Sequence, residues 1–140
     1  MSNFARFTPL VAASLVSLTP ALVIAREFET KRVQFRPGAT SQVIEASIRG
    51  YDIVDYILNA RAGQIMNVSM ATNNTANYFN IIPPGEKKTA IFNGSIDGNQ
   101  FEKTLTQSGD YKIRVYLMRS AARRGETANY RLEMIISALE

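Results

Sequence analysis

The fold of this chain is decided by an alternating stretch near its C-terminus, Tyr111-Lys112-Ile113-Arg114-Val115-Tyr116-Leu117-Met118. Apolar and aromatic residues occupy every second position, as in a β-strand with one buried face. A second alternating run follows at Tyr130–Ile136. Between the two lies a cationic loop, Arg119-Ser120-Ala121-Ala122-Arg123-Arg124-Gly125, with no acid before Glu126. The sequence therefore predicts two strands that present three guanidinium groups on the loop between them.

The same period of two recurs through the chain, and helical periodicity is almost absent. The expected strands are Lys31–Phe35, Gln42–Ile48, Val54–Ala60, Gln64–Ala71, Tyr78–Ile82, Thr89–Asn93, Gln100–Leu105, Tyr111–Met118 and Tyr130–Ile136. Turn residues such as Pro37-Gly38 and Asp97-Gly98-Asn99 separate them. Eight or nine short strands at this spacing predict an all-β protein, an antiparallel β-sandwich or barrel, and we expect the sandwich. The alternation also predicts the core-facing residues Val54, Tyr56, Leu58, Ala60, Met66, Val68, Met70, Phe101, Leu105, Tyr111, Ile113, Val115 and Leu117.

The first 25 residues have the pattern of a secretory signal peptide. Arg6 is their only charged residue, an apolar run follows it, and Val23-Ile24-Ala25 places small residues before the expected cleavage site. The apolar run is short for a bilayer and contains Pro20, so we expect export and no membrane anchor. Cleavage after Ala25 leaves residues 26–140, enough for a single domain.

Composition excludes most catalytic chemistry. The chain has no cysteine and no histidine, so disulfides, thiolate nucleophiles, imidazole zinc sites and Ser-His-Asp triads are unavailable. Asp52 and Asp55 are too poorly placed for a carboxylate pair, and we interpret both as turn and edge acids in water. Asp97-Gly98-Asn99 has too few carboxylates for calcium and is interpreted as a turn. We expect no enzyme, no metal and no cofactor.

The net charge of +4 and the Arg123-Arg124 pair raise nucleic-acid binding as an alternative. A sheet that binds nucleic acid shows aromatic residues interleaved with basic ones across one face. Here the aromatic residues alternate mainly with the core positions, and the exported chain favours another partner. We therefore expect no nucleic acid as ligand.

The arginine loop itself has two interpretations: a solvated connection between strands, or a binding site for an anionic partner. Ala121-Ala122 can form one helical turn, ended by Gly125, which places Arg119 and Arg123 on the same side. Like charges so placed repel, and an anionic partner relieves that repulsion. The turn Gly50-Tyr51-Asp52 adds an aromatic residue with a polar tip. If both turns lie at one end of the sandwich, they form a small cationic and aromatic binding surface.

Several of these motifs also resemble a known family in order and spacing. They are Val33-Gln34-Phe35-Arg36-Pro37-Gly38, Gly50-Tyr51-Asp52, Ala62-Gly63-Gln64, Ser108-Gly109-Asp110-Tyr111, Arg114-Val115 and Arg119-Ser120-Ala121-Ala122-Arg123. Together they resemble the periplasmic inhibitors of goose-type lysozyme, whose Ser-Gly-x-Tyr motif also recurs in inhibitors of other lysozyme types. The resemblance implies a β-sandwich exported to the periplasm of Gram-negative bacteria, with a lysozyme as its protein partner.

The resemblance also implies a site. It assigns lysozyme binding to Tyr51, Arg119 and Arg123, with the loop entering the substrate cleft and its guanidinium groups pairing with acids there. We add Ser108, Tyr111 and Arg124 as secondary contacts. The segment Arg124-Gly125-Glu126 after the second arginine departs from the family pattern. Its added acid can alter the affinity or the lysozyme type preferred. The oligomeric state, monomer or homodimer, stays open.

A second resemblance leads to an alternative. Tyr56, Ala62-Gly63-Gln64 and the run Ser108–Val115 are similar to small sandwich domains at the C-terminus of secreted bacterial peptidases. These are accessory modules, which implies a non-catalytic secreted domain that binds glycan or protein. Exposed aromatic residues on a flat face favour glycan binding, whereas a protruding arginine loop favours insertion into a cleft.

Overall fold

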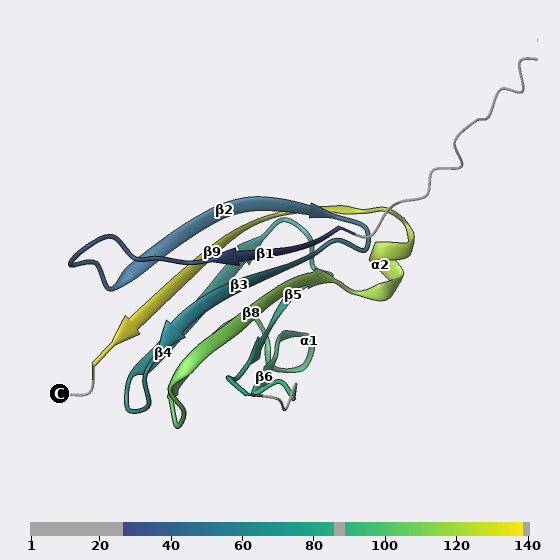
Figure 1. Ribbon diagram of the computed structural model, residues 1–140. Helices are drawn as coiled ribbons and strands as arrows, with labels where there is room; N and C mark the ends of the chain where they lie inside the picture. Colours follow the sequence, from purple (N-terminus) through teal and green to yellow (C-terminus); the bar gives the residue numbers. More distant parts are fainter. Residues whose placement is uncertain (1–26, 86–88, 139–140) are drawn as a thin grey trace, which may run out of the picture.

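A computed structural model of the protein describes residues 27–85 and 89–138 (Figure 1). The predicted signal peptide, residues 1–25, lies outside these ranges. The described residues form nine strands and two short helices in two layers (Figure 1). These are β1 Phe28–Arg32, β2 Ser41–Arg49, β3 Ile53–Ala60, β4 Ile65–Thr72, β5 Asn77–Ile82, β6 Phe92–Asn93, α1 Gly94–Asp97, β7 Gln100–Thr104, β8 Gly109–Leu117, α2 Arg119–Arg123 and β9 Thr127–Ser137. Each of the nine predicted strands overlaps a strand of the structure in the expected order, although β1 starts three residues earlier than predicted and β6 keeps only the last two of its five predicted residues.

The strands divide into a five-stranded sheet, β1-β3-β8-β5-β6, and a four-stranded sheet, β2-β9-β4-β7. The predicted all-β sandwich is confirmed, and nearly every neighbouring pair is antiparallel. One pair departs from that expectation, because β1 runs parallel to β3 with Phe28 opposite Ile53 and Arg32 opposite Ile57. The reason is topological: β2, which runs back between them in the chain, belongs to the other sheet.

Alternation along each strand directs one set of side chains into the space between the sheets. All the residues predicted to face the core are buried, including Tyr56, Val68 and Ile113. The two layers are also joined by a polar contact in the core, where the hydroxyl groups of Tyr56 and Tyr130 lie 2.7 Å apart. Each tyrosine thus fills the core with its ring and satisfies its hydroxyl inside it.

Asp55 does not lie in water, contrary to the interpretation from sequence. Only 2% of its side chain is exposed, and its two oxygens accept hydrogen bonds from Arg114 Nε at 2.8 Å and Nη2 at 2.9 Å. The ring of Phe28 lies 5.4 Å from Cζ of the same arginine. Asp55 is on the outer face of the five-stranded sheet as alternation requires, but neighbouring side chains cover it there. Asp52 does belong to a turn, as expected.

Strand β8 carries the motifs of interest at its two ends. It begins at Gly109, directly after Ser108, and ends at Leu117, two residues before α2 begins. Nine residues of extended chain separate the two ends by roughly 27 Å. The Ser108–Tyr111 turn and the arginine loop therefore lie at opposite ends of the molecule (Figure 1).

Candidate functional site

The arginine loop folds as the sequence predicts, into the single helical turn α2. Ala121 and Ala122 are 0% and 1% exposed and belong to the hydrophobic core. The turn ends at Gly125, whose φ of 68° is the left-handed conformation that favours glycine. Two backbone hydrogen bonds close it, from Gly125 N to Ala122 O and from Glu126 N to Ala121 O. Two buried alanines thus fix the loop to the sandwich.

Arg119 and Arg123 occupy the outer side of this turn. Both are exposed, and they are four residues apart, which is one turn of helix. Within residues 27–85 and 89–138, neither side chain forms a hydrogen bond or an ion pair. The first turn of α2 contains no acid, and Met118 provides no side-chain cap. These two cations are therefore available to an anionic partner from outside the protein.

The Tyr51 turn lies beside α2. The link is made by backbone hydrogen bonding, since Gly50 N donates to Glu126 O at 2.9 Å. Arg49 adds a side-chain bond from Nε to Gly125 O at 3.4 Å. Tyr51 itself is 38% exposed. Residues some seventy positions apart in the sequence are thus brought together at one end of the sandwich, as the predicted binding surface requires.

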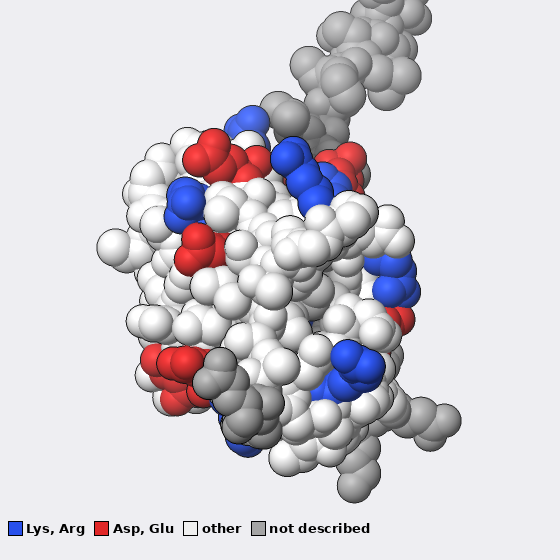
Figure 2. All heavy atoms as spheres, turned by 90° about the vertical axis from the view of Figure 1, so that its left-hand side faces the viewer, with Lys and Arg blue, Asp and Glu red and all other residues white. Residues whose placement is uncertain are grey.

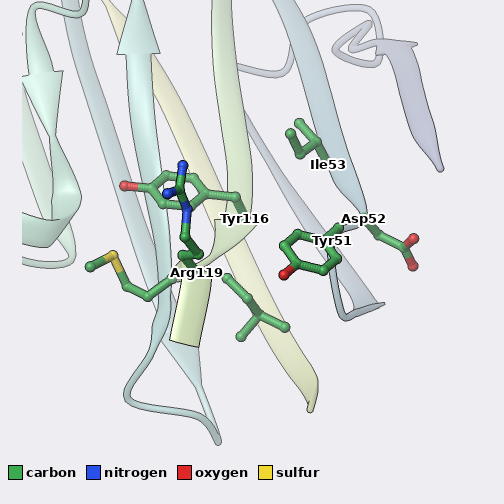
Figure 3. Close-up of a pocket in the computed structure, with 7 residues that line it drawn as sticks. Tyr51, Asp52, Ile53, Tyr116 and Arg119 are labelled. Atoms are coloured by element: carbon green, nitrogen blue, oxygen red, sulfur yellow. The ribbon is translucent and has the colours of Figure 1, made fainter. Parts of the chain in front are cut away.

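A pocket of about 520 Å³ separates the Tyr51 turn from the start of α2 (Figure 3). Its lining residues are Tyr51, Asp52, Ile53, Tyr116, Leu117, Met118 and Arg119. The Asp52 carboxylate points away from Tyr51 (Figure 3). It accepts hydrogen bonds from the backbone nitrogens of Glu27 and Arg49, each at 3.3 Å. Arg119 is therefore the charged side chain that this lining offers to a partner.

Sequence analysis missed three members of this pocket: Ile53, Tyr116 and Met118. Tyr116 and Met118 hold the outward positions of the β8 alternation, next to the arginine loop. An aromatic residue and a methionine where the strand pattern calls for polar residues are a signal that the sequence does contain. Ile53 gave no such signal, because it looks like any other residue at the start of a strand.

The added acid Glu126 is held by two neighbours. Its Oε1 accepts a hydrogen bond from Asn74 Nδ2 at 3.0 Å, and its Oε2 accepts one from Arg124 Nε at 2.6 Å. These hydrogen bonds, that of Asn74 first, hold the pKa of Glu126 below its usual value. Arg124 thus already has an internal counter-charge, which distinguishes it from Arg119 and Arg123.

The structure does not bring Ser108 and Tyr111 to this end of the molecule. Ser108 Oγ accepts a hydrogen bond from Ala62 N at 2.8 Å, and the Tyr111 hydroxyl donates one to Gln107 O at 2.6 Å. Both residues stabilise the turn that precedes β8. Figure 2 views the end opposite α2, where basic and acidic side chains are scattered among broad uncharged areas. It shows no continuous band of Lys and Arg on that face.

Two further features bear on the class of the protein. The part of the chain that the structure describes has no group of three or more His, Cys, Asp or Glu residues placed to hold a metal. Nor do the described residues include a helix long and apolar enough to cross a membrane. What stands out is one end of the sandwich, where an exposed tyrosine lies next to a turn with two arginines, Arg119 and Arg123, that form no ion pair among the described residues. Fold and site together define a small all-β protein equipped to bind another macromolecule.

Comparison with known proteins identifies the family to which this chain belongs. No protein-family model matches the sequence. The chain is 39% identical to PliG of Aeromonas hydrophila, a periplasmic inhibitor of g-type lysozyme; the match covers 81% of this chain and 100% of that one, with a TM-score of 0.73. PliG of Salmonella Typhimurium is 26% identical with a TM-score of 0.63, over 78% of this chain and 98% of the other. The Escherichia coli inhibitor of g-type lysozyme is 29% identical over 107 residues, 74% of this chain and 78% of that protein. The chain belongs to the family of periplasmic g-type lysozyme inhibitors.

Proposed function

We propose that this protein is a periplasmic, non-catalytic inhibitor of lysozyme, with g-type (goose-type) lysozyme as its partner. Family membership supports this function, since relatives that carry this description match almost over their whole length. The observation that carries the proposal within this chain is the pair Arg119 and Arg123, exposed on a rigid turn beside Tyr51. The alternative, a secreted accessory module that binds glycan or protein, gains no support from these relatives.

We assign lysozyme binding to the side chains of Tyr51, Arg119 and Arg123. Glycosidases generally act through a pair of carboxyl groups in the substrate cleft. A guanidinium group pairs with a carboxylate through two parallel hydrogen bonds, so arginines are suited to enter such a cleft. α2 is then a plug that occupies the cleft and excludes the glycan substrate.

The local structure around α2 favours this mechanism. Ala121 and Ala122 in the core hold the turn in one position, so little freedom is lost when it docks. Arg119 and Arg123 give up no internal ion pair within the described residues when they meet an acid. Arg124 would have to leave Glu126, and we therefore assign it no direct role. Ser108 and Tyr111, at the far end, are likewise left out of the proposed contact.

The location follows from the same proposal. We infer that residues 1–25 are a signal peptide removed on export and that residues 26–140 are the mature inhibitor. The mature N-terminus would then be one residue before Glu27. The sandwich itself starts at Phe28, so cleavage after Ala25 removes none of its strands.

The test is inhibition of a g-type lysozyme in a cell-wall lysis assay with the purified mature protein. The double variant Arg119→Ala/Arg123→Ala is expected to lose about a hundredfold in potency, since an arginine at the centre of an interface commonly contributes tenfold or more. The matched control is Arg36→Ala/Arg61→Ala, which removes the same charge from two exposed arginines of other loops. Its potency should stay within about twofold of the parent, because exposed charges outside an interface contribute little. Equal potency of the two double variants would contradict the assigned site, and a parent that inhibits no g-type lysozyme would contradict the function.

A further inference from the structure

We propose that the pocket between the Tyr51 turn and α2 takes one large apolar side chain of the lysozyme, next to the acid that Arg119 meets. This inference rests on the proposed function and assigns the same end of the molecule a second, apolar element of recognition. Arginine pairing selects an acid, whereas the pocket selects the residue beside that acid. Both features must fit the same segment of the partner.

The walls of the pocket are mostly apolar and open to solvent. Met118 is 41% exposed and Tyr51 38%, and both line this pocket. Tyr116 donates its hydroxyl hydrogen to Asn80 Oδ1 at 3.1 Å, so its polar tip is occupied and its ring remains as wall. Arg119 lines the pocket together with Tyr116 (Figure 3). The pocket therefore presents ring and aliphatic surfaces with one cation at its side.

These surfaces determine the chemistry of the occupant. Water against such walls lacks hydrogen-bond partners, so an apolar side chain that displaces it gains affinity. A polar uncharged side chain would lose its own hydrogen bonds there, and a basic one would be repelled by Arg119. The volume of about 520 Å³ leaves ample room for the side chain of an aromatic or large aliphatic residue.

The occupant belongs to the lysozyme because the pocket is continuous with the proposed contact. Tyr51 and Arg119 line the pocket and are also members of the assigned site. Because Arg119 lines the pocket, a lysozyme segment that brings an acid to Arg119 also brings the residues beside that acid close to the pocket. Tyr51 has an apolar ring and a polar hydroxyl, so it can contact both the acid and the apolar residue of that segment.

Met118 provides the sharpest variant, because glutamine matches it closely in length and is polar and uncharged. Met118→Gln is expected to weaken inhibition about tenfold, which corresponds to about 1.4 kcal/mol of binding free energy. Met118→Leu keeps the apolar wall and should stay within about threefold of the parent. The matched control is Ile96→Gln in α1, since Ile96 is 79% exposed and does not line the pocket. It should leave inhibition unchanged. Thermal unfolding of each variant is measured alongside, and no large shift is expected for exposed positions.

Salt dependence separates the pocket from the arginines. Met118→Gln should weaken binding equally at low and high salt, because it removes no charge. Arg119→Ala should lose more at low salt, where electrostatic attraction is strongest.

Four outcomes decide whether the pocket binds an apolar side chain of the lysozyme. A tenfold loss in Met118→Gln, with Met118→Leu and Ile96→Gln near the parent, supports the proposal. Parent-like potency of Met118→Gln overturns it while leaving the proposed function intact. If sedimentation shows that Met118→Gln dissociates a homodimer of the inhibitor, the occupant is a second copy of this chain and the proposal is wrong. A parent that inhibits no g-type lysozyme overturns the proposed function, and this inference with it.

Discussion

Replacing Arg114 with methionine is expected to leave a carboxylate buried without its counter-charge. In the parent, the Asp55 side chain is 2% exposed and the Arg114 side chain 33% exposed. Two hydrogen bonds, at 2.8 and 2.9 Å, join them in a bidentate pair. The methionine keeps most of the aliphatic stem that packs on the sheet, so the main loss is the charge that Asp55 faces.

Because Asp55 is more deeply buried than Arg114, we expect the two single substitutions to lower the stability by different amounts. Removing one member of a buried pair typically costs about 3–5 kcal/mol, because the remaining charge is uncompensated. Arg114→Met should reach this range, since the Asp55 side chain is only 2% exposed. Asp55→Val should cost less, about 1–2 kcal/mol, because a third of Arg114 is already exposed and its guanidinium can turn to solvent. The double variant should lie within about 1 kcal/mol of the milder single variant, because it leaves no charge buried.

Urea denaturation of the parent, both single variants and the double variant measures all four free energies of unfolding. For a domain of this size each kcal/mol lowers the unfolding temperature by about 4 °C, so Arg114→Met should unfold roughly 12–20 °C below the parent. Equal losses in the two single variants that add in the double variant would refute the reasoning. Such a result would mean that Asp55 is solvated despite its burial in the structure.

Three further predictions concern other parts of the molecule. Arg119→Glu should abolish inhibition and yet leave the unfolding temperature unchanged or slightly higher, because an acid suits the first turn of a helix better than a cation; a lower unfolding temperature would count against this account of α2. Gly94→Ala should destabilise the fold by about 1–3 kcal/mol in urea, because its new Cβ would press on the backbone oxygen of Phe79 and lie 3.1 Å from the nitrogen of the same residue. The pKa of Asp110 is lowered from 3.8 to about 2, first by the hydrogen bond from Arg32, so this carboxylate contributes stability above pH 4 that is lost as the pH falls towards 2. Arg32→Gln should therefore be less stable than the parent at neutral pH, and the difference in unfolding temperature should shrink between pH 4 and pH 2; a difference that is constant with pH would contradict it.

Much of the fold could be predicted because its strands alternate cleanly. Tyr111, Ile113, Val115 and Leu117 are all buried, as the period of two requires. Alternation specifies which face a residue is on, but not what covers that face. Asp55 was misjudged for this reason, since Arg114 lies on a neighbouring strand that the sequence does not identify as its partner. The parallel pairing of β1 with β3 was missed for the same reason: strand order depends on contacts between distant segments.

The candidate site was predictable where local chemistry defines it. Ala121-Ala122 followed by Gly125 indicated a short helical turn, and that turn is present. Its nearness to Tyr51 depends on the pairing of β2 with β9, where Arg49 lies opposite Thr127. From the sequence alone, we could say only that the two turns form one surface if both lie at the same end of the sandwich.

The alanines of α2 also limit how this inhibitor can diversify or be engineered. Successive residues of a helix are rotated by about 100°, so deleting one residue before Ala121 would move Arg123 into the place of Ala122 and direct an arginine towards the core in place of a methyl group. The packing of Ala121 and Ala122 in the core therefore fixes the length of the connection between Leu117 and Thr127. New specificities would have to come from substitution at the outward positions 119, 120 and 123, so a library aimed at other lysozymes should vary identity there and hold length constant.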